Sequence, residues 1–116
     1  MRHRNKGVIL DRLKGKRQAL LRGLLTNFIL YEKMDTTRAK AKAVKPIVER
    51  LITRARNKDI ATQRYIAARV YTDGARRKLI EVLGPRYRER PGGYTRIIPL
   101  RQRLGDRAHI VRIEFV

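Results

Sequence analysis

Positive charge constrains this chain more than any other feature of its sequence. Thirty Lys and Arg residues stand against ten Asp and Glu residues, which gives a formal net charge of +20 over 116 residues. Such an excess repels itself and weakens the compact state unless a polyanion lies against it. Nucleic acid is the commonest polyanion of suitable size, and binding it releases condensed counterions. The charge therefore favours a nucleic-acid-binding protein over the alternative, a basic face exposed only to solvent.

Composition narrows the class further. Apolar residues make up 42% of the chain, which suits one domain with one modest hydrophobic core. Cysteine is absent, so disulfides and thiolate-metal sites are excluded. The basic start is not followed by an uninterrupted apolar run, and no segment approaches the roughly 18 consecutive apolar residues of a membrane span. We therefore expect a protein of the cytoplasm with no membrane partner.

Apolar residues recur every three or four positions through the first part of the chain, as in amphipathic helices. A first helix is predicted from Leu13, followed by a short strand over residues 31–35. A second helix should begin at Thr36 or Thr37, where a hydroxyl could accept a bond from a free backbone N–H. Pro46 lies inside this second helix and should kink it.

Two further helices are predicted before the pattern changes. Asp59 should cap a third helix that runs to about Tyr71, and a fourth should begin near Ala75. Gly84 and Pro85 predict the end of the fourth helix, because Gly accepts positive φ and Pro cannot continue a helix. The inward-facing residues predicted for the third helix are Ala61, Tyr65 and Ala68, with Ile66 and Val70 as further candidates.

Near the C-terminus the apolar period changes from helical to alternating. One strand begins at Thr95 and contains Pro99, which favours an edge position. A second strand places His109 and Phe115 on one face, together with the residues between them at alternate positions. Two such strands joined by a short connection predict an antiparallel hairpin.

These elements predict an α+β fold with the order α-β-α-α-α-β-β. Residues 1–12 form a basic N-terminal arm, and residues 13–116 form a single domain. We expect the helices to pack on one face of a small three-stranded mixed sheet.

The first group of candidate RNA contacts lies in the arm and at the start of the first helix, where only Asp11 opposes the positive charge. A segment this basic cannot pack into a core, and it is expected to fold on binding RNA. The alternative is a solvated tail. The residues of this group are Arg2, His3, Arg4, Lys6, Arg12, Lys14, Lys16, Arg17 and Arg22.

The second group lies in the loop over residues 85–96. Arg guanidinium groups can contact phosphates with two N–H groups, Tyr rings can stack on bases, and paired Gly residues let the backbone approach a sugar-phosphate strand. The alternative is an ordinary loop whose Tyr residues anchor the core. The residues of this group are Arg86, Tyr87, Arg88, Arg90, Gly92, Gly93, Tyr94 and Arg96.

The third group is a basic stripe on the second predicted helix. It consists of Arg38, Lys40, Lys42 and Lys45. RNA contact and simple exposure to solvent are balanced alternatives here, because charged helix faces are common on protein surfaces.

An enzyme is not expected. A metal-dependent nuclease needs two or three carboxylates that converge on a cation, and only Glu32 and Asp35 lie close together here. His109 lies on an apolar strand face, where a core imidazole is the plainer interpretation. No Gly-rich signature of nucleotide binding is present. We expect no catalytic residue, metal, cofactor or small-molecule substrate.

A duplex-DNA-binding protein is the main rival, since the third and fourth helices could imitate a helix-turn-helix pair. A basic nuclease is the second rival. The basic residues, however, are spread along several elements and not gathered on one helix. That distribution favours RNA that surrounds the protein on several sides.

Several segments, taken in order, resemble one known family. They are Met1-Arg2-His3-Arg4, Thr36-Thr37-Arg38-Ala39-Lys40-Ala41-Lys42, Leu51-Ile52-Thr53, Pro85-Arg86-Tyr87, Arg90-Pro91-Gly92-Gly93-Tyr94-Thr95-Arg96-Ile97, Gly105-Asp106 and Ile113-Glu114. In this order and spacing they resemble bacterial large-subunit ribosomal protein seventeen from end to end.

The resemblance implies a structural constituent of the large ribosomal subunit, on its solvent side near the exit of the peptide tunnel. It also implies contact with large-subunit rRNA and with neighbouring ribosomal proteins, a place in the ribosome in the cytoplasm, and no catalytic activity.

Overall fold

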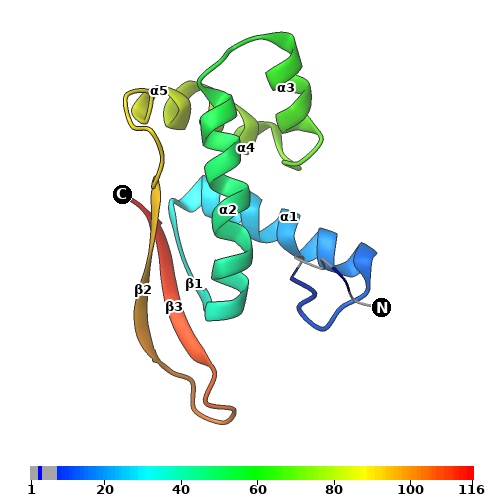
Figure 1. The fold of residues 1–116 in the computed structure, drawn as a ribbon, viewed down its shortest axis with the longest axis vertical. Helices are drawn as coiled ribbons and strands as arrows, with labels where there is room; N and C mark the ends of the chain where they lie inside the picture. The colour runs from blue at the N-terminus through cyan, green and yellow to red at the C-terminus, as the bar shows by residue number, and fades with distance from the viewer. Residues whose placement is uncertain (1–2, 4–7) are drawn as a thin grey trace.

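The structure, a computed structural model, describes residue 3 and residues 8–116. Its elements, in order, are α1 (Lys14–Tyr31), β1 (Lys33–Thr37), α2 (Arg38–Ala55), α3 (Ile60–Ala67), α4 (Asp73–Lys78), the π-helical turn η1 (Leu79–Leu83), α5 (Gly84–Arg86), β2 (Thr95–Gln102) and β3 (His109–Phe115) (Figure 1). The predicted α+β class and the predicted order of elements are confirmed.

The three strands form one sheet in the order β1-β3-β2. Ile113 of β3 lies opposite Met34 of β1 and opposite Ile97 of β2, and both pairings are antiparallel. The expectation of a mixed sheet is wrong in this detail, because the apolar strand β3 takes the centre and separates the two strands that run the same way. β2 is an edge strand, as Pro99 predicts, and its register shifts between Pro99 and Arg101.

Helices α1 and α2 pack on one face of this sheet (Figure 1). Val111 and Ile113 of β3 are buried among the apolar side chains of both helices. Phe28 of α1 stacks on Phe115, with ring centroids 4.4 Å apart and planes inclined by 12°. Alternate residues of one strand thus face the helices, which matches the predicted hairpin pattern.

Helix α2 begins at the predicted place, but its cap differs from the prediction. Thr37 is the N-cap residue, yet its side chain makes no capping hydrogen bond. Thr37 is also the last residue of β1 and pairs with Ile110 of β3, so the strand and not the hydroxyl fixes its backbone. The helix then runs through Pro46 to Ala55.

Helix α3 is shorter than predicted and turned about its axis. The Asp59 carboxylate accepts a hydrogen bond from the Thr62 N–H at 2.8 Å, which confirms the predicted cap. This start places Thr62 and Ile66 in the core, whereas Ala61 and Ala68 are exposed and Tyr65 is half-buried. The predicted inward face is therefore wrong for both alanines, whereas the further candidates Ile66 and Val70 are buried.

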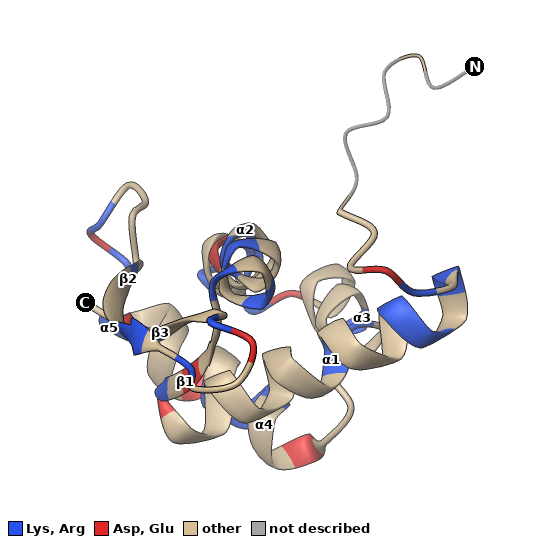
Figure 2. Cartoon of the chain, turned by 90° about the horizontal axis from the view of Figure 1, so that it is seen from below, with Lys and Arg blue, Asp and Glu red and all other residues tan. Residues whose placement is uncertain are grey.

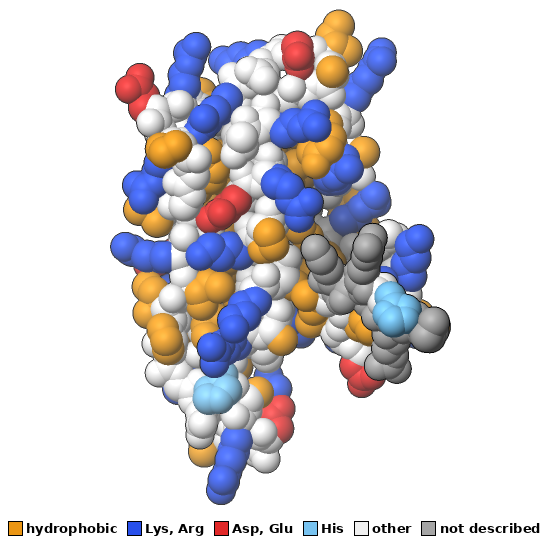
Figure 3. All heavy atoms as spheres, viewed as in Figure 1, with side chains coloured by type: hydrophobic (Ala, Val, Ile, Leu, Met, Phe, Trp, Pro, Cys, Tyr) orange, Lys and Arg blue, Asp and Glu red, His pale blue; other side chains and the backbone are white. Residues whose placement is uncertain are grey.

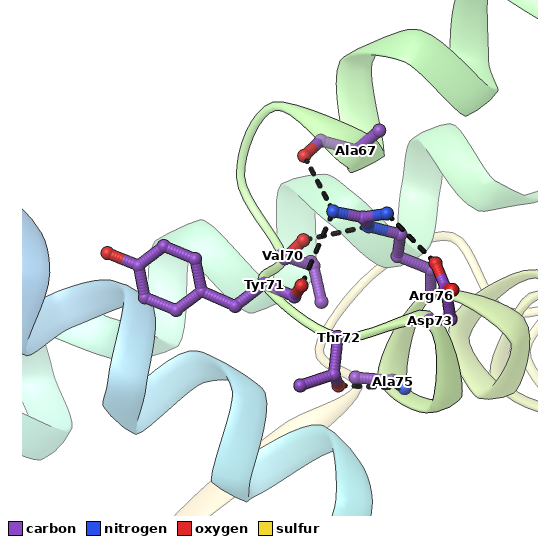
Figure 4. A network of polar contacts seen from close by, with 7 residues as sticks. All are labelled: Ala67, Val70, Tyr71, Thr72, Asp73, Ala75 and Arg76. Atoms are coloured by element: carbon purple, nitrogen blue, oxygen red, sulfur yellow. Dashed lines mark hydrogen bonds and ion pairs between the residues drawn. The ribbon is translucent and has the colours of Figure 1, made fainter.

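Arg76 explains why α3 ends at Ala67 and not near Tyr71. Its guanidinium donates to the carbonyl of Val70 at 2.8 Å and to those of Ala67 and Tyr71 at 3.4 Å each (Figure 4). It also pairs with Asp73 at 3.0 Å. Several carbonyl groups between α3 and α4 are satisfied in this way, so the chain turns where the periodicity alone suggests more helix.

The predicted helix exit at Gly84 and Pro85 is also wrong. Gly84 has helical dihedrals (φ −56°, ψ −56°), its N–H bonds to the Leu79 carbonyl, and the helical path continues through Pro85 to Arg86. Pro is tolerated in the first turn of a helix. Gly84 is needed for space: a Cβ there would lie 2.6 Å from the carbonyl oxygen of Ala55.

This close approach predicts opposite effects for two Gly-to-Ala substitutions. Gly84→Ala should destabilise the protein by about 1–3 kcal/mol, because the backbone of α2 must move to admit the methyl group. Gly23→Ala in α1 meets no atom within 4 Å and should stabilise by up to about 1 kcal/mol through helix propensity. Denaturant unfolding of both variants measures the difference. Equal effects would contradict the packing role of Gly84.

Candidate nucleic-acid interface

Part of the predicted first group lies outside the described residues: Arg2, Arg4 and Lys6. His3 is described and is exposed. Arg12, Lys14, Lys16 and Arg17 stand at the start of α1 or just before it, and Arg12 donates to the Leu10 carbonyl at 3.0 Å. The first turn of α1 carries no acidic residue, and Leu13 at its N-cap offers no side-chain bond. Lys14, Lys16 and Arg17 therefore stand at the positive end of a helix dipole without internal compensation.

Arg22 of α1 is occupied within the fold. Its Nη2 donates to the Ala68 carbonyl at 2.8 Å, and its guanidinium lies 5.3 Å from the centre of the Tyr71 ring. These contacts leave the group exposed but fixed in position.

The α2 stripe has a similar beginning. Arg38 and Lys42 are exposed, and Lys40 and Lys45 are half-buried. The first turn again lacks an acidic residue, and no side chain caps it. Two long helices of this protein thus begin with basic residues.

Arg38 and Lys42 also line a shallow hollow of about 560 Å³ together with His109 of β3. His109 is exposed, so the prediction of a core imidazole is wrong. It stands at the end of β3 nearest the hairpin turn, beside the exposed start of α2 and away from the buried middle of the strand.

The two Tyr residues of the loop are core residues. Tyr87 and Tyr94 are 4% and 1% exposed, and their rings lie 5.2 Å apart. The Tyr87 hydroxyl donates to the Val116 carbonyl at 2.7 Å, and Arg56 donates to the Tyr94 hydroxyl at 2.5 Å. Stacking of these rings on bases is therefore wrong, and the alternative of core anchors holds, because buried rings offer no free face.

Two Arg residues of the loop group pair with carboxylates. Arg86 forms an ion pair with Glu32, and Arg96 pairs with Glu114 at 2.8 Å. The Arg86 hydrogen bond, helped by Lys78 at 3.6 Å, holds the pKa of Glu32 below its ordinary value of 4.5. These two cations are therefore partly neutralised before any partner arrives.

The remaining residues of this group are two arginines and two glycines that lie outside the core. Arg88 and Arg90 are exposed, and Arg90 donates to the Gly92 carbonyl at 3.2 Å. Gly92 and Gly93 have φ of 151° and 63°, and a Cβ at either would meet no atom within 4 Å. Positive φ, and not close packing, is the reason for the paired glycines.

A further basic cluster, which the sequence patterns did not reveal, surrounds Tyr65. The guanidinium groups of Arg69 and Arg54 lie 3.7 Å and 4.2 Å from the centre of the Tyr65 ring. Arg50 of α2 stands beside them and donates to the Pro46 carbonyl at 3.2 Å. The four-residue spacing of Arg50 and Arg54 was the available signal, but only the packing of α3 on α2 brings Arg69 and Tyr65 to it.

Seen from below, Lys and Arg are spread over α1, α2, α3 and the sheet (Figure 2). Among residue 3 and residues 8–116, no three His, Asp or Glu side chains lie close enough together to hold a metal ion. Within the same described residues, no helix is long and apolar enough to cross a membrane. The fold and its surface therefore define a small, basic α+β protein.

Comparison with known proteins gives the family. The family model described as Ribosomal protein L17 matches residues 20–116. The chain is 42% identical over all 116 residues to the large ribosomal subunit protein bL17 of Rickettsia bellii, of which it covers 82%. It is 40% and 43% identical, also over its whole length, to the proteins of that name from Rickettsia typhi and Rickettsia canadensis, of which it covers 85% each.

The chain belongs to the L17 family of ribosomal proteins, as its ordered motifs predict. It is a structural constituent of the large ribosomal subunit and not an enzyme, and it is part of the ribosome in the cytoplasm.

The Glu32–Arg86 pair predicts a pH effect. Arg86→Gln should raise the pKa of Glu32, because the largest cause of its depression is removed. The pair contributes stability above pH 4.5, and this contribution is lost as the pH falls through the lowered folded-state pKa. NMR titration of the side-chain carboxyl groups measures the change. Asp59, whose pKa is lowered by hydrogen bonds from Thr62, is the internal control and should not move.

Proposed function

We propose that this protein binds large-subunit rRNA through its basic arm, the beginnings of α1 and α2, and the exposed Arg88 and Arg90 of the loop. In this proposal the core holds these separate contacts at fixed distances, so that one small protein joins neighbouring rRNA segments. The membership in a family of large-subunit constituents supports rRNA as the polyanion.

The observation that carries this proposal is the chemistry of two helix N-termini. Helices α1 and α2 each have 18 residues, start with basic side chains, and lack both an acidic residue in the first turn and a side-chain cap. In a free protein this arrangement is unfavourable, because the N-terminal N–H groups and the side chains carry charge of the same sign. Phosphate groups would satisfy both at once.

The hollow beside the start of α2 adds to this argument. Arg38, Lys42 and the His109 ring face one volume, so charge and imidazole N–H groups are available to the same phosphate segment. The loop supplies Arg88 and Arg90 at the opposite end of α2 (Figure 1), where the chain runs from α5 into β2. Contacts this far apart suit RNA that follows the surface.

The resemblance of the ordered motifs to the bacterial family further supports a location near the exit of the peptide tunnel, beside neighbouring ribosomal proteins. On this proposal, the exposed cations face rRNA and the protein has no substrate.

Crosslinking of assembled large subunits, with mapping of the nucleotides joined to the start of α1 and to the loop, tests the location.

The helix-start argument predicts that one variant changes stability and binding in opposite directions. Lys14→Glu with Arg38→Glu should stabilise the free protein by about 0.3–1 kcal/mol per helix, because each dipole is now compensated. The same variant should bind rRNA more weakly, with the salt slope of log K reduced by about 0.7–0.9 for each lost phosphate contact. Thermal unfolding and filter binding over a salt series measure the two effects.

The control is Arg77→Glu, which makes the same charge change at an exposed position in the last turn of α4. It should alter the slope less per substitution. An unchanged slope in the double variant, or tighter binding to duplex DNA than to rRNA, would count against the proposed function.

A further inference from the structure

A groove between α1, α2 and the end of α3 has an apolar floor. Its volume is about 440 Å³, within the range of sites for small planar ligands. Leu25 and Leu51 form the buried part of the floor, and Leu21 and Ile47 are half-buried beside them. The apolar side chains of α1 and α2 are thus partly uncovered in this groove.

The rim of the groove is cationic. Arg22, Arg50 and Arg69 line it, and no Asp or Glu does so among the described residues. Each guanidinium is held by a carbonyl: Arg22 by Ala68 at 2.8 Å, Arg50 by Pro46 at 3.2 Å, and Arg69 by Tyr65 at 3.2 Å. These bonds hold three positive charges around one opening. Binding an anion there would cost less conformational entropy, because the three side chains are already ordered.

A second hollow continues this basic path toward the loop. It shares Arg50 and Tyr65 with the groove, and it extends past Arg54 to Gly92. Its carboxylate, Glu49, already accepts a hydrogen bond from Thr95 at 2.9 Å. Figure 3 shows Lys and Arg side chains gathered around hydrophobic ones in the corresponding upper right part of the molecule, over α2 and α3.

We propose that this groove binds one unstacked nucleotide of RNA, with its base on the apolar floor beside Tyr65 and its phosphates at Arg50 and Arg69. The inference rests on the proposed function and names a site within it. RNA provides a planar apolar face and an anion in every nucleotide, which matches the floor and the rim together. A peptide would need an acidic side chain beside an apolar one at a matching spacing.

The test uses the full chain and two RNA hairpins that differ by a single bulged nucleotide, 2-aminopurine. The bulged hairpin should bind at least tenfold more tightly than the fully paired one. Bound 2-aminopurine should be protected from quenching by acrylamide, because the base lies against the floor. The chain contains no Trp, so its own fluorescence does not interfere.

Two kinds of variant separate the floor from the rim. Arg50→Gln with Arg69→Gln should weaken binding of the bulged hairpin more than tenfold. The same variant should lower the salt slope of log K by about 1.4–1.8, because two phosphate contacts are lost and each contributes about 0.7 in single strands and 0.9 in a duplex. Ile47→Lys adds a positive charge but spoils the floor, so the preference for the bulge and the protection from acrylamide should both be lost. Leu21→Gln gives the same test from α1, and Arg77→Gln on α4 is the control for the loss of one positive charge outside the groove.

The outcomes distinguish this inference from the proposed function. Equal affinity for the two hairpins, or an unprotected base, overturns the nucleotide site but leaves rRNA binding intact if both hairpins bind with a steep salt slope. A protein that binds neither hairpin nor rRNA contradicts the proposed function itself. Groove variants that bind both hairpins normally but fail to enter large subunits would indicate a protein partner and would also overturn the site.

Discussion

The apolar contact between the central strand and the two long helices is the interaction on which the rest of the structure depends. It joins Val111 and Ile113 of β3 to α1 and α2, and the Phe28–Phe115 stack closes one end of it. A chain with a net charge of +20 repels itself, so this one core must offset that repulsion before any partner binds. The separate basic contacts are held in place only because this core exists.

The few carboxylates of the chain hold particular Arg side chains in position. Asp35 pairs with Arg112 across the sheet at 2.7 Å. Arg103 and the Ala108 N–H lower the pKa of Asp106 to about 2 in the hairpin turn. Exposed pairs of this kind contribute little stability, because water screens the attraction between their charges. The paired Arg side chains help to fix the fold. The basic side chains at the starts of α1 and α2 have no such carboxylate in the first helical turn and stay available to bind phosphate.

Periodicity predicted the elements well and their ends poorly. The apolar spacing placed α1, α2 and the hairpin correctly, because burial of one face decides those elements. It failed at α3, where Arg76 satisfies the carbonyls of a turn, and at Gly84, which serves the close approach of Ala55. For the candidate site, the density of positive charge predicted the exposed basic residues at the helix starts. The composition of the loop also predicted base stacking by Tyr87 and Tyr94, which are buried, because burial depends on contacts from distant parts of the chain.

By itself, the sequence determined the excess of positive charge, the α+β order, the absence of thiol chemistry and the resemblance to one family, because these depend on residue types and on local spacing. Tertiary structure decided which cations are neutralised, which aromatic rings are buried, and which residues form the groove. Arg50 and Arg69 are far apart in the chain and meet only when α3 packs on α2. The four-residue spacing of Arg50 and Arg54 is visible in the sequence, but the position of Arg69 beside Arg50 is not, because it depends on packing.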